Sequence, residues 1–195
     1  MRTIWGYDVE SLEPILTADD FNDLTNGIYA DNPRAEAAVL AASQAVRNYC
    51  GWHISPSVEC TAHPVGGARV AKLPAGYVSE IDSIKVDGTT LTTDEYEWRS
   101  DGLIRRTDKR KWTGAWDGIE VAYTAGYSPD AIPDLMEAVC SVASGVLSVS
   151  PGVTNESADG VSISYSANAS SIAAALTSQQ QSALEPYRLV SSHAT

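Results

Sequence analysis

The chain has 195 residues, which is enough for one domain with a sizeable core and additional arms. It carries 13 Lys and Arg against 25 Asp and Glu, and its net charge of −12 disfavours a protein that grips nucleic acid by its phosphates. Three cysteines are an odd number, which disfavours a disulfide framework and suits free thiols in a reducing compartment.

Residues 1–32 are acidic, with Arg2 as the one base among seven Asp and Glu. They lack the basic start and the continuous apolar run of a signal peptide. Thr17 as an N-cap and Gly27 beyond the end predict a short helix over 18–24. We interpret this segment as an N-terminal acidic arm that carries a short helix.

The next segment, 33–52, predicts the first long helix. It begins at Asn32-Pro33, ends at Gly51 and carries no charged residue from 37 to 46. Its many alanines allow close contact with another helix.

Residues 56–125 change to short apolar runs that are separated by turn signals. Asp87-Gly88 and Asp101-Gly102 have the composition of tight hairpins, and Gly66-Gly67 separates further runs. We predict an antiparallel β module that is inserted between two helices.

The last strand of this module and the second long helix follow each other directly. Ile119, Val121 and Tyr123 alternate with more polar residues, as in a half-buried strand. Pro133 suits a first helical position and opens a predicted helix over 133–149. The stretch from 138 to 155 carries no charge. The helix is too short and too rich in serine to cross a membrane, so we expect no membrane partner.

Both long helices are apolar around most of their circumference, and such helices are buried around most of it. We therefore expect them to pack against each other and against sibling chains. The expected oligomer interface is Val39, Ala42, Val46, Tyr49, Leu135, Val139, Val142 and Val146.

Residues 151–195 form a Ser-rich C-terminal arm with Arg188 as its only Lys or Arg. Alternation predicts a short strand over 161–165, and a polar helix is expected over 177–184. So little apolar surface does not support independent folding, and we expect this arm to become ordered by docking.

The β module contains a basic run of five Lys and Arg with a single acid, Asp108. The run is either a solvated loop or a contact with an acidic surface of a neighbouring copy or partner. Trp116 and the tryptophan next to the run are candidates for stacking on a ligand. The expected partner contact is Arg105, Arg106, Lys109, Arg110, Lys111 and Trp112.

The one group of residues with metal-ligand chemistry is Cys50 and His53 followed by Cys60 and His63. Two thiolates and two imidazoles are a ligand set that zinc accepts. However, the first pair ends a helix and the second lies on a predicted strand, so convergence is not guaranteed, and buried cysteine is also common as a small hydrophobe. A Cys–His nucleophile lacks a group to orient the histidine. We expect no metal and no cofactor, and we keep zinc or cysteine chemistry as an alternative.

Two motifs carry a resemblance to a known family. Residues 41–53 (AASQAVRNYCGWH) and 121–127 (VAYTAGY), the latter followed by 132–138 (IPDLMEA), resemble the head-to-tail connector (adaptor) proteins of tailed bacteriophages. The hairpin pattern between them fits this family too. The likeness covers about 33–150 and consists of packing motifs, with no catalytic residues to transfer.

The order of the predicted elements gives an α+β fold in which the helix pair (about 33–52 and 133–149) brackets the β insertion (56–125), with extended N- and C-terminal arms. The chain thus divides into an arm (1–32), a connector core (33–150), which is the part that the resemblance covers, and a second arm (151–195). The resemblance implies a structural, non-enzymatic virion protein, synthesised in the host cytoplasm, that forms a ring of about twelve copies in the neck below the portal.

The implied partners of such a ring are the portal protein on one side and a tail-side stopper or tail protein on the other. Double-stranded DNA would pass through the lumen without specific binding, because an acidic lumen repels phosphates. The alternative from a different class is a β-rich ligand-binding module that uses the 56–125 sheet.

Overall fold

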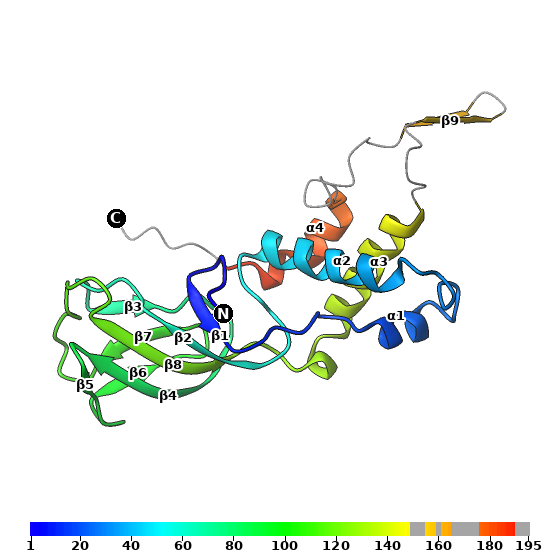
Figure 1. Ribbon diagram of the computed structural model, residues 1–195. Helices are drawn as coiled ribbons and strands as arrows, with labels where there is room; N and C mark the ends of the chain where they lie inside the picture. The colour runs from blue at the N-terminus through cyan, green and yellow to red at the C-terminus, as the bar shows by residue number, and fades with distance from the viewer. Residues whose placement is uncertain (149–154, 159–160, 165–175, 190–195) are drawn as a thin grey trace. The chain divides into compact units, whose positions relative to one another are not determined.

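The computed structural model describes residues 1–148, 155–158, 161–164 and 176–189. The chain divides into two compact units (Figure 1). Unit 1 comprises Met1–Glu13, Cys50–Ala131 and Tyr187–Thr195, and unit 2 comprises Pro14–Tyr49 and Ile132–Pro186. Helices and antiparallel sheets together make an α+β fold, as the sequence predicts.

Unit 1 contains a five-stranded antiparallel sheet with the order β1-β2-β8-β4-β5. The central strand β8 pairs with β2 on one side and with β4 on the other, and the three run side by side in Figure 1. The strands are β1 (Tyr7–Val9), β2 (Val58–Ala62), β4 (Val78–Val86), β5 (Thr89–Thr90) and β8 (Ile119–Ala125).

A second sheet of unit 1 has three antiparallel strands in the order β3-β7-β6. They are β3 (Val70–Lys72), β6 (Tyr96–Trp98) and β7 (Leu103–Arg106). Side chains from both sheets are buried, among them Tyr96 and Ile104 of this sheet and Ile84 of the larger one. They form the core of unit 1.

The tight turns of unit 1 follow from local sequence. Asp87 and Gly88 have φ values of 48° and 80° and join β4 to β5, as a two-residue hairpin with two left-handed positions requires. Gly102, with φ 79°, closes the loop between β6 and β7. Both turns lie where the Asp-Gly pairs predict them.

Strand β8 also follows its sequence pattern. Its side chains alternate between buried and half-buried positions along the whole strand, and Val121, Tyr123 and Ala125 have no exposed surface. The alternation predicted at Ile119, Val121 and Tyr123 is therefore confirmed.

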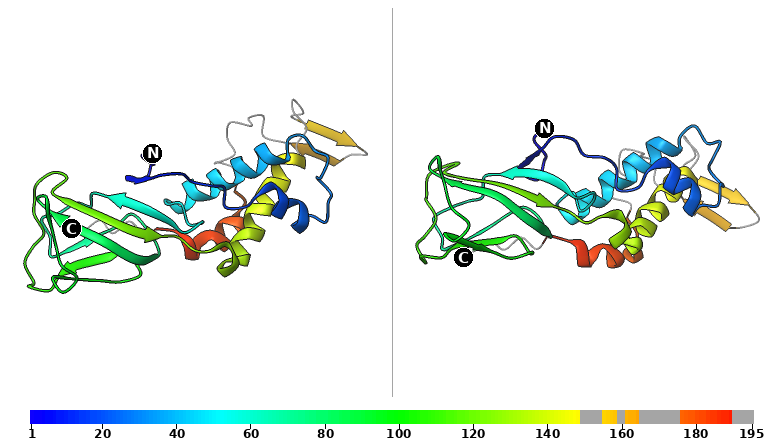
Figure 2. Two further views of the ribbon diagram at one scale, coloured as in Figure 1. Left: turned by 60° about the horizontal axis from the view of Figure 1, so that its bottom comes forward. Right: turned by 90° about the horizontal axis from the view of Figure 1, so that it is seen from below.

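Unit 2 is mainly helical. Its helices are α1 (Ala18–Leu24), α2 (Ala35–Cys50, whose last residue lies in unit 1), α3 (Pro133–Ser148) and α4 (Ser178–Leu184). Figure 2 shows α4 beside α3, where Gln180 Nε2 donates a hydrogen bond of 3.2 Å to Ser141 Oγ. The strands β9 (Asn155–Ala158) and β10 (Val161–Ser164) pair antiparallel. Short 3-10 turns cover Pro129–Ala131 and Glu185–Tyr187.

Capping explains where the short helices begin. Thr17 accepts a hydrogen bond from the Asp20 N–H and Thr177 accepts one from the Gln180 N–H, and each forms a full capping box. The predicted helix over 18–24 is confirmed, and α4 begins one residue after the predicted start at 177. The predicted ends at 149 and 165 lie outside the described residues.

Two further findings concern the chain as a whole. Residues 7–9 form a strand, β1, inside the segment that the sequence presents as an arm with a helix. In the part of the chain that the structure describes, no helix has both the length and the apolar character that a membrane crossing demands.

Candidate functional site

The two motifs that carry the resemblance meet in unit 1. His53 follows the end of α2, and its Nε2 lies 3.0 Å from the carbonyl oxygen of Ala125, the last residue of β8. The Tyr127 N–H donates a hydrogen bond of 2.8 Å to the Ile54 carbonyl oxygen. Gly126 lies between these contacts with φ +103°. We name residues 50–56 and 125–127 the motif junction.

The motif junction also receives the N-terminal strand. The Tyr7 hydroxyl lies 2.7 Å from His53 Nδ1 and accepts a hydrogen bond of 3.0 Å from the His53 N–H. Both residues are buried. Because a carbonyl only accepts, Nε2 carries the hydrogen that it donates to Ala125, and Nδ1 accepts the Tyr7 hydroxyl proton.

The described end of the C-terminal arm lies on the same junction. The indole N–H of Trp52 donates a hydrogen bond of 2.7 Å to the Tyr187 carbonyl oxygen. The Leu189 N–H donates one of 2.8 Å to the Cys50 carbonyl oxygen. These described residues of the C-terminal arm therefore contact their own chain, and docking of the arm on a partner stays a prediction.

The four candidate zinc ligands are not brought together. Both ring nitrogens of His53 have the protein partners described above. Burial raises the pKa of the Cys60 thiol to about 12, so this sulfur is protonated at neutral pH. No group of three or more His, Cys, Asp and Glu among the described residues is placed to hold a metal ion, and both Cys50 and His63 are described. The spacing alone does not make a metal site here.

The helix stripes expected at an oligomer interface lie inside the chain. Tyr49 and Val146 keep some exposed surface, whereas the other six have at most 7 %. Those six are Val39, Ala42, Val46, Leu135, Val139 and Val142. Other residues of the same chain already shield these six side chains from water, so the six belong to the apolar core of a single copy.

The helix faces that remain accessible are the more polar ones. On α2 the exposed positions include Glu36, Leu40, Gln44 and Asn48, and the Gln44 amide donates a hydrogen bond of 2.8 Å to the Asn48 side chain. Leu40 is 50 % exposed. A neighbouring protein would contact this exposed face of α2. The stripe of Val39, Ala42 and Val46 lies on the buried face of the helix.

The basic run is a structured loop, and part of its charge is neutralised within the chain. Arg105 pairs with Glu97 at 2.5 Å, and Arg106 pairs with Asp108 at 2.9 Å. The Arg106 guanidinium, hydrogen bonded to Asp108, holds the pKa of that carboxyl low, at about 2. Arg110 Nε also lies 3.8 Å from Asp108 Oδ2, whereas Lys109 and Lys111 are exposed and take part in no ion pair among the described residues.

The two tryptophans beside the basic run have opposite environments. Trp112, which the sequence places at a partner contact, is only 2 % exposed, and its indole N–H lies 3.4 Å from the Ile104 carbonyl oxygen. It is a core residue, because the loop folds back on strand β7. Trp116 is 98 % exposed and is the tryptophan that a partner can reach.

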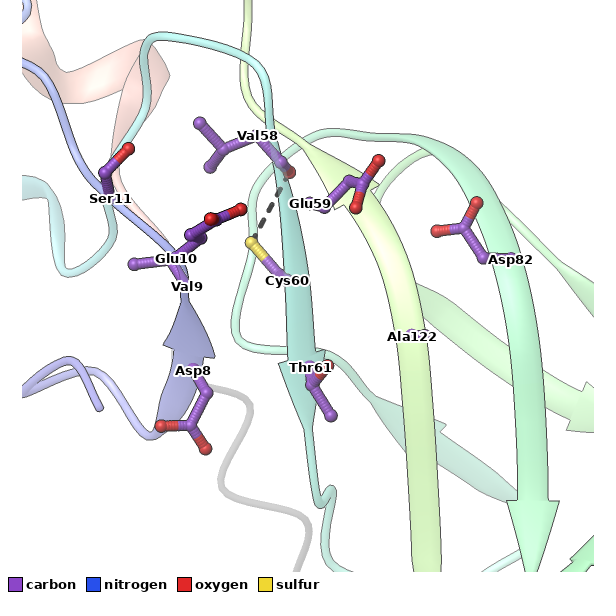
Figure 3. A pocket seen from close by; sticks show the side chains of 10 residues that line it. All are labelled: Asp8, Val9, Glu10, Ser11, Val58, Glu59, Cys60, Thr61, Asp82 and Ala122. Atoms are coloured by element: carbon purple, nitrogen blue, oxygen red, sulfur yellow. Dashed lines mark hydrogen bonds between the residues drawn. The ribbon is translucent and has the colours of Figure 1, made fainter. Parts of the chain in front are cut away.

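An open hollow of about 660 Å³ lies on the five-stranded sheet of unit 1 (Figure 3). Cys60 is among the residues that line it, with its thiol 3.6 Å from the Val58 carbonyl oxygen. The hollow is lined by four carboxylates and no cation: Asp8, Glu10, Glu59 and Asp82. No single stretch of sequence reveals this group, because its members come from β1, β2, β4 and the segment after β1.

The overall chain is similar to known neck structures. A chain from the neck of an empty gene transfer agent particle, computed with C6 symmetry, matches with a TM-score of 0.62 and 16 % identity, covering 94 % of this chain and 95 % of that chain. A chain from the neck of the native particle, computed with C12 symmetry, matches with a TM-score of 0.59, 16 % identity and the same coverage. No protein-family model and no curated protein matches.

These likenesses define the class of fold. The chain has the head-to-tail connector fold of phage-like particles, as the motifs at 41–53 and 121–127 predict. The match covers 94 % of this chain and 95 % of the neck chain.

Proposed function

We propose that this chain is a head-to-tail adaptor of a virion, with a structural role in the neck between the portal protein and a tail-side stopper or tail protein. The observation that carries the proposal is the fold match over 94 % of this chain to a neck chain. In this proposal the chain has no catalytic activity and needs no cofactor, and it is made in the host cytoplasm before it joins the particle.

The adaptor acts as a ring of about twelve copies. The C6 and C12 symmetries of the matching necks support a closed ring of identical chains. About twelve copies at −12 each carry about −144, so acidic residues at the lumen would repel phosphates and let double-stranded DNA pass without specific binding.

The three parts of the chain have separate tasks in this proposal. The connector core (33–150) builds the ring, with its long helices bracketing the β insertion, and the arms (1–32 and 151–195) reach the proteins above and below. Subunit contacts on the helices use their accessible faces, including Leu40 of α2 together with Tyr49 and Val146. The six buried stripe residues support these faces from behind.

Electron microscopy of the purified chain mixed with isolated portal tests the proposal. The expected result is a ring of identical copies stacked on one end of the portal, with a central channel. A chain that stays monodisperse and leaves the portal bare contradicts the adaptor role and favours the β-rich ligand-binding module. A matched control is the same mixture with unfolded, alkylated chain, which should leave the portal unchanged.

A further inference from the structure

Two neighbouring loops of unit 1 each carry one exposed apolar side chain. Trp116 is 98 % exposed and Val65 is 89 % exposed. Their loops are joined, because the Gly67 N–H donates a hydrogen bond of 3.0 Å to the Thr113 carbonyl oxygen and the Trp112 N–H donates one of 2.8 Å to the Ala68 carbonyl oxygen. An exposed tryptophan on an ordered loop is a typical anchor of a protein interface.

The loop that carries Trp116 also carries positive charge. Asp108 neutralises Arg106 and accepts a hydrogen bond of 2.9 Å from the Arg110 N–H, which holds the turn in shape. Lys109 sits in this turn with φ +61°. Since the turn is already formed, docking would not have to order it. We name Val65, Lys109, Arg110, Lys111 and Trp116 the basic tip.

The hollow on the five-stranded sheet has the complementary character. Ala122, opposite Thr61 in the pairing of β8 with β2, supplies half-buried apolar surface, and carboxylates lie around it. Asp82 is an extra residue between Ile81 and Ser83 in the pairing of β4 with β8. Such a bulge redirects a side chain, and Figure 3 shows Asp82 beside the other lining residues.

The charges of the hollow are unmatched within the described part of the chain. None of its four carboxylates takes part in an ion pair there, and no Lys or Arg lines the hollow. The basic tip does not fill the hollow of its own chain, because Trp116 is 98 % exposed. An aromatic anchor on a loop that also carries Lys109 and Lys111 fits an open hollow lined by carboxylates.

We propose that the basic tip of one copy docks into the acidic hollow of the next copy. The inference rests on the ring proposed above. The two surfaces are different patches of one chain, and a contact between different patches repeats from copy to copy and closes a ring when the rotation allows it. Trp116 packs over Ala122 of the next chain, while Lys109 and Lys111 pair with its carboxylates. DNA is the less suitable occupant, since the hollow repels phosphates.

Cross-linking between two chains that each carry one exposed cysteine, with Cys50 and Cys60 buried, tests the contact without altering its anchor. Ala115→Cys places a thiol beside Trp116, and Ser11→Cys places one at the hollow, both in a chain that also carries Cys140→Ser. Rings assembled on portal from an equal mixture should form heterodimers with a short bismaleimide. Asp23→Cys on α1 is the matched control and should give at least about tenfold less heterodimer with Ala115→Cys than Ser11→Cys does.

Charge reversal tests the same contact in a second way. K109E/K111E, which makes the tip acidic, and E10K/E59K/D82K, which makes the hollow basic, should each raise the concentration needed for ring assembly by about tenfold, because like charges then face each other. An equal mixture of the two should restore assembly, since acidic tip meets basic hollow and basic tip meets acidic hollow around an even-numbered ring. R34E/R99E changes exposed arginines elsewhere and should leave assembly unchanged.

The outcomes separate this inference from the proposed function. Rings on portal that neither cross-link at these positions nor respond to charge reversal overturn the contact and leave the adaptor role standing. If the unmodified chain forms no ring on portal, the adaptor role fails and the contact fails with it. Unchanged assembly with altered DNA retention in E10K/E59K/D82K overturns the contact and places the hollow at the lumen instead.

Discussion

His53 donates a hydrogen bond from Nε2 to the carbonyl oxygen of Ala125, at 3.0 Å. This contact joins the turn after α2 to the end of β8, two segments that are 72 residues apart in the chain. The Tyr7 hydroxyl completes the arrangement by bonding the Nδ1 and the N–H of the same histidine. The two motifs therefore hold the end of α2 and the end of β8 together. Their residues have a packing role.

Removing the Tyr7 hydroxyl should destabilise the chain. Tyr7→Phe takes away the partner of two buried polar atoms of His53, which costs about 1–3 kcal/mol in the free energy of unfolding. Urea denaturation measures this as a lower midpoint.

Tyr123 provides the matched control. Its hydroxyl is buried and has no hydrogen-bond partner among the described residues. Tyr123→Phe should therefore leave the midpoint unchanged or raise it, because a buried polar group without a partner costs free energy. Equal losses in the two variants would contradict the importance of the Tyr7–His53 bond.

A methyl group at Gly126 should disrupt the motif junction. A Cβ there would lie 2.5 Å from the Pro56 carbonyl oxygen and 2.7 Å from His53 Nε2, and the φ of +103° disfavours any other residue. Gly126→Ala should lower the free energy of unfolding by about 2 kcal/mol or more, as thermal and urea denaturation would measure. Gly114→Ala is the control, since nothing lies within 4 Å of its Cβ. A Gly126→Ala chain as stable as this control would refute the clash.

Local features of the fold could be predicted because their causes are local. The Asp87-Gly88 hairpin needs two residues that accept positive φ, and the start of α1 needs Thr17 with Asp20 three residues later. Strand β1 could not be predicted in this way. Three residues around Tyr7 carry too short an alternation, and their pairing with β2 depends on residues more than 50 positions further along the chain.

The interaction surfaces were harder to predict than the elements, because burial is decided at long range. Trp112 and Trp116 lie in one polar loop, and only the folding of that loop onto the Ile104 and Ala68 carbonyls distinguishes them. The acidic hollow needs the β4 bulge at Asp82 as well as the pairing of β1 with β2. Apolar stripes such as Val39 with Val46 show that a helix face is buried, and they do not show whether its own chain or a neighbour buries it.

Stability should fall at alkaline pH because of Cys60. Burial raises the pKa of this thiol to about 12 from an ordinary value of 9.0. Below pH 9 the thiol is protonated in both the folded and the unfolded chain, and its contribution to the free energy of unfolding is fully present. Between pH 9 and pH 12 the unfolded chain loses this proton and the folded chain keeps it, so the free energy of unfolding falls by up to about 1.4 kcal/mol per pH unit.

Urea midpoints at pH 7.5, 9 and 10 measure this effect. Cys60→Ala removes the thiol, so its midpoint should depend less steeply on pH above 9 than that of the unchanged chain. The tyrosines of the unfolded chain ionise in both proteins and are cancelled by the comparison. Identical slopes in the two proteins would show that Cys60 ionises as readily when folded.

Alanine at Trp112 should lower the stability of the chain, whereas alanine at Trp116 should impair only its assembly. The two residues are four positions apart in the sequence. Trp112 is 2 % exposed, so Trp112→Ala leaves a cavity and should cost about 3–5 kcal/mol in the free energy of unfolding. Trp116 is 98 % exposed, so Trp116→Ala should change that free energy by no more than about 0.5 kcal/mol. Urea denaturation gives both values, and ring assembly on portal is measured on the same preparations. The Trp116→Ala chain should be fully folded and yet defective in assembly, because it lacks the side chain that would be buried against the next copy. A Trp116→Ala chain that assembles like the unchanged protein would remove the basic tip from the ring interface.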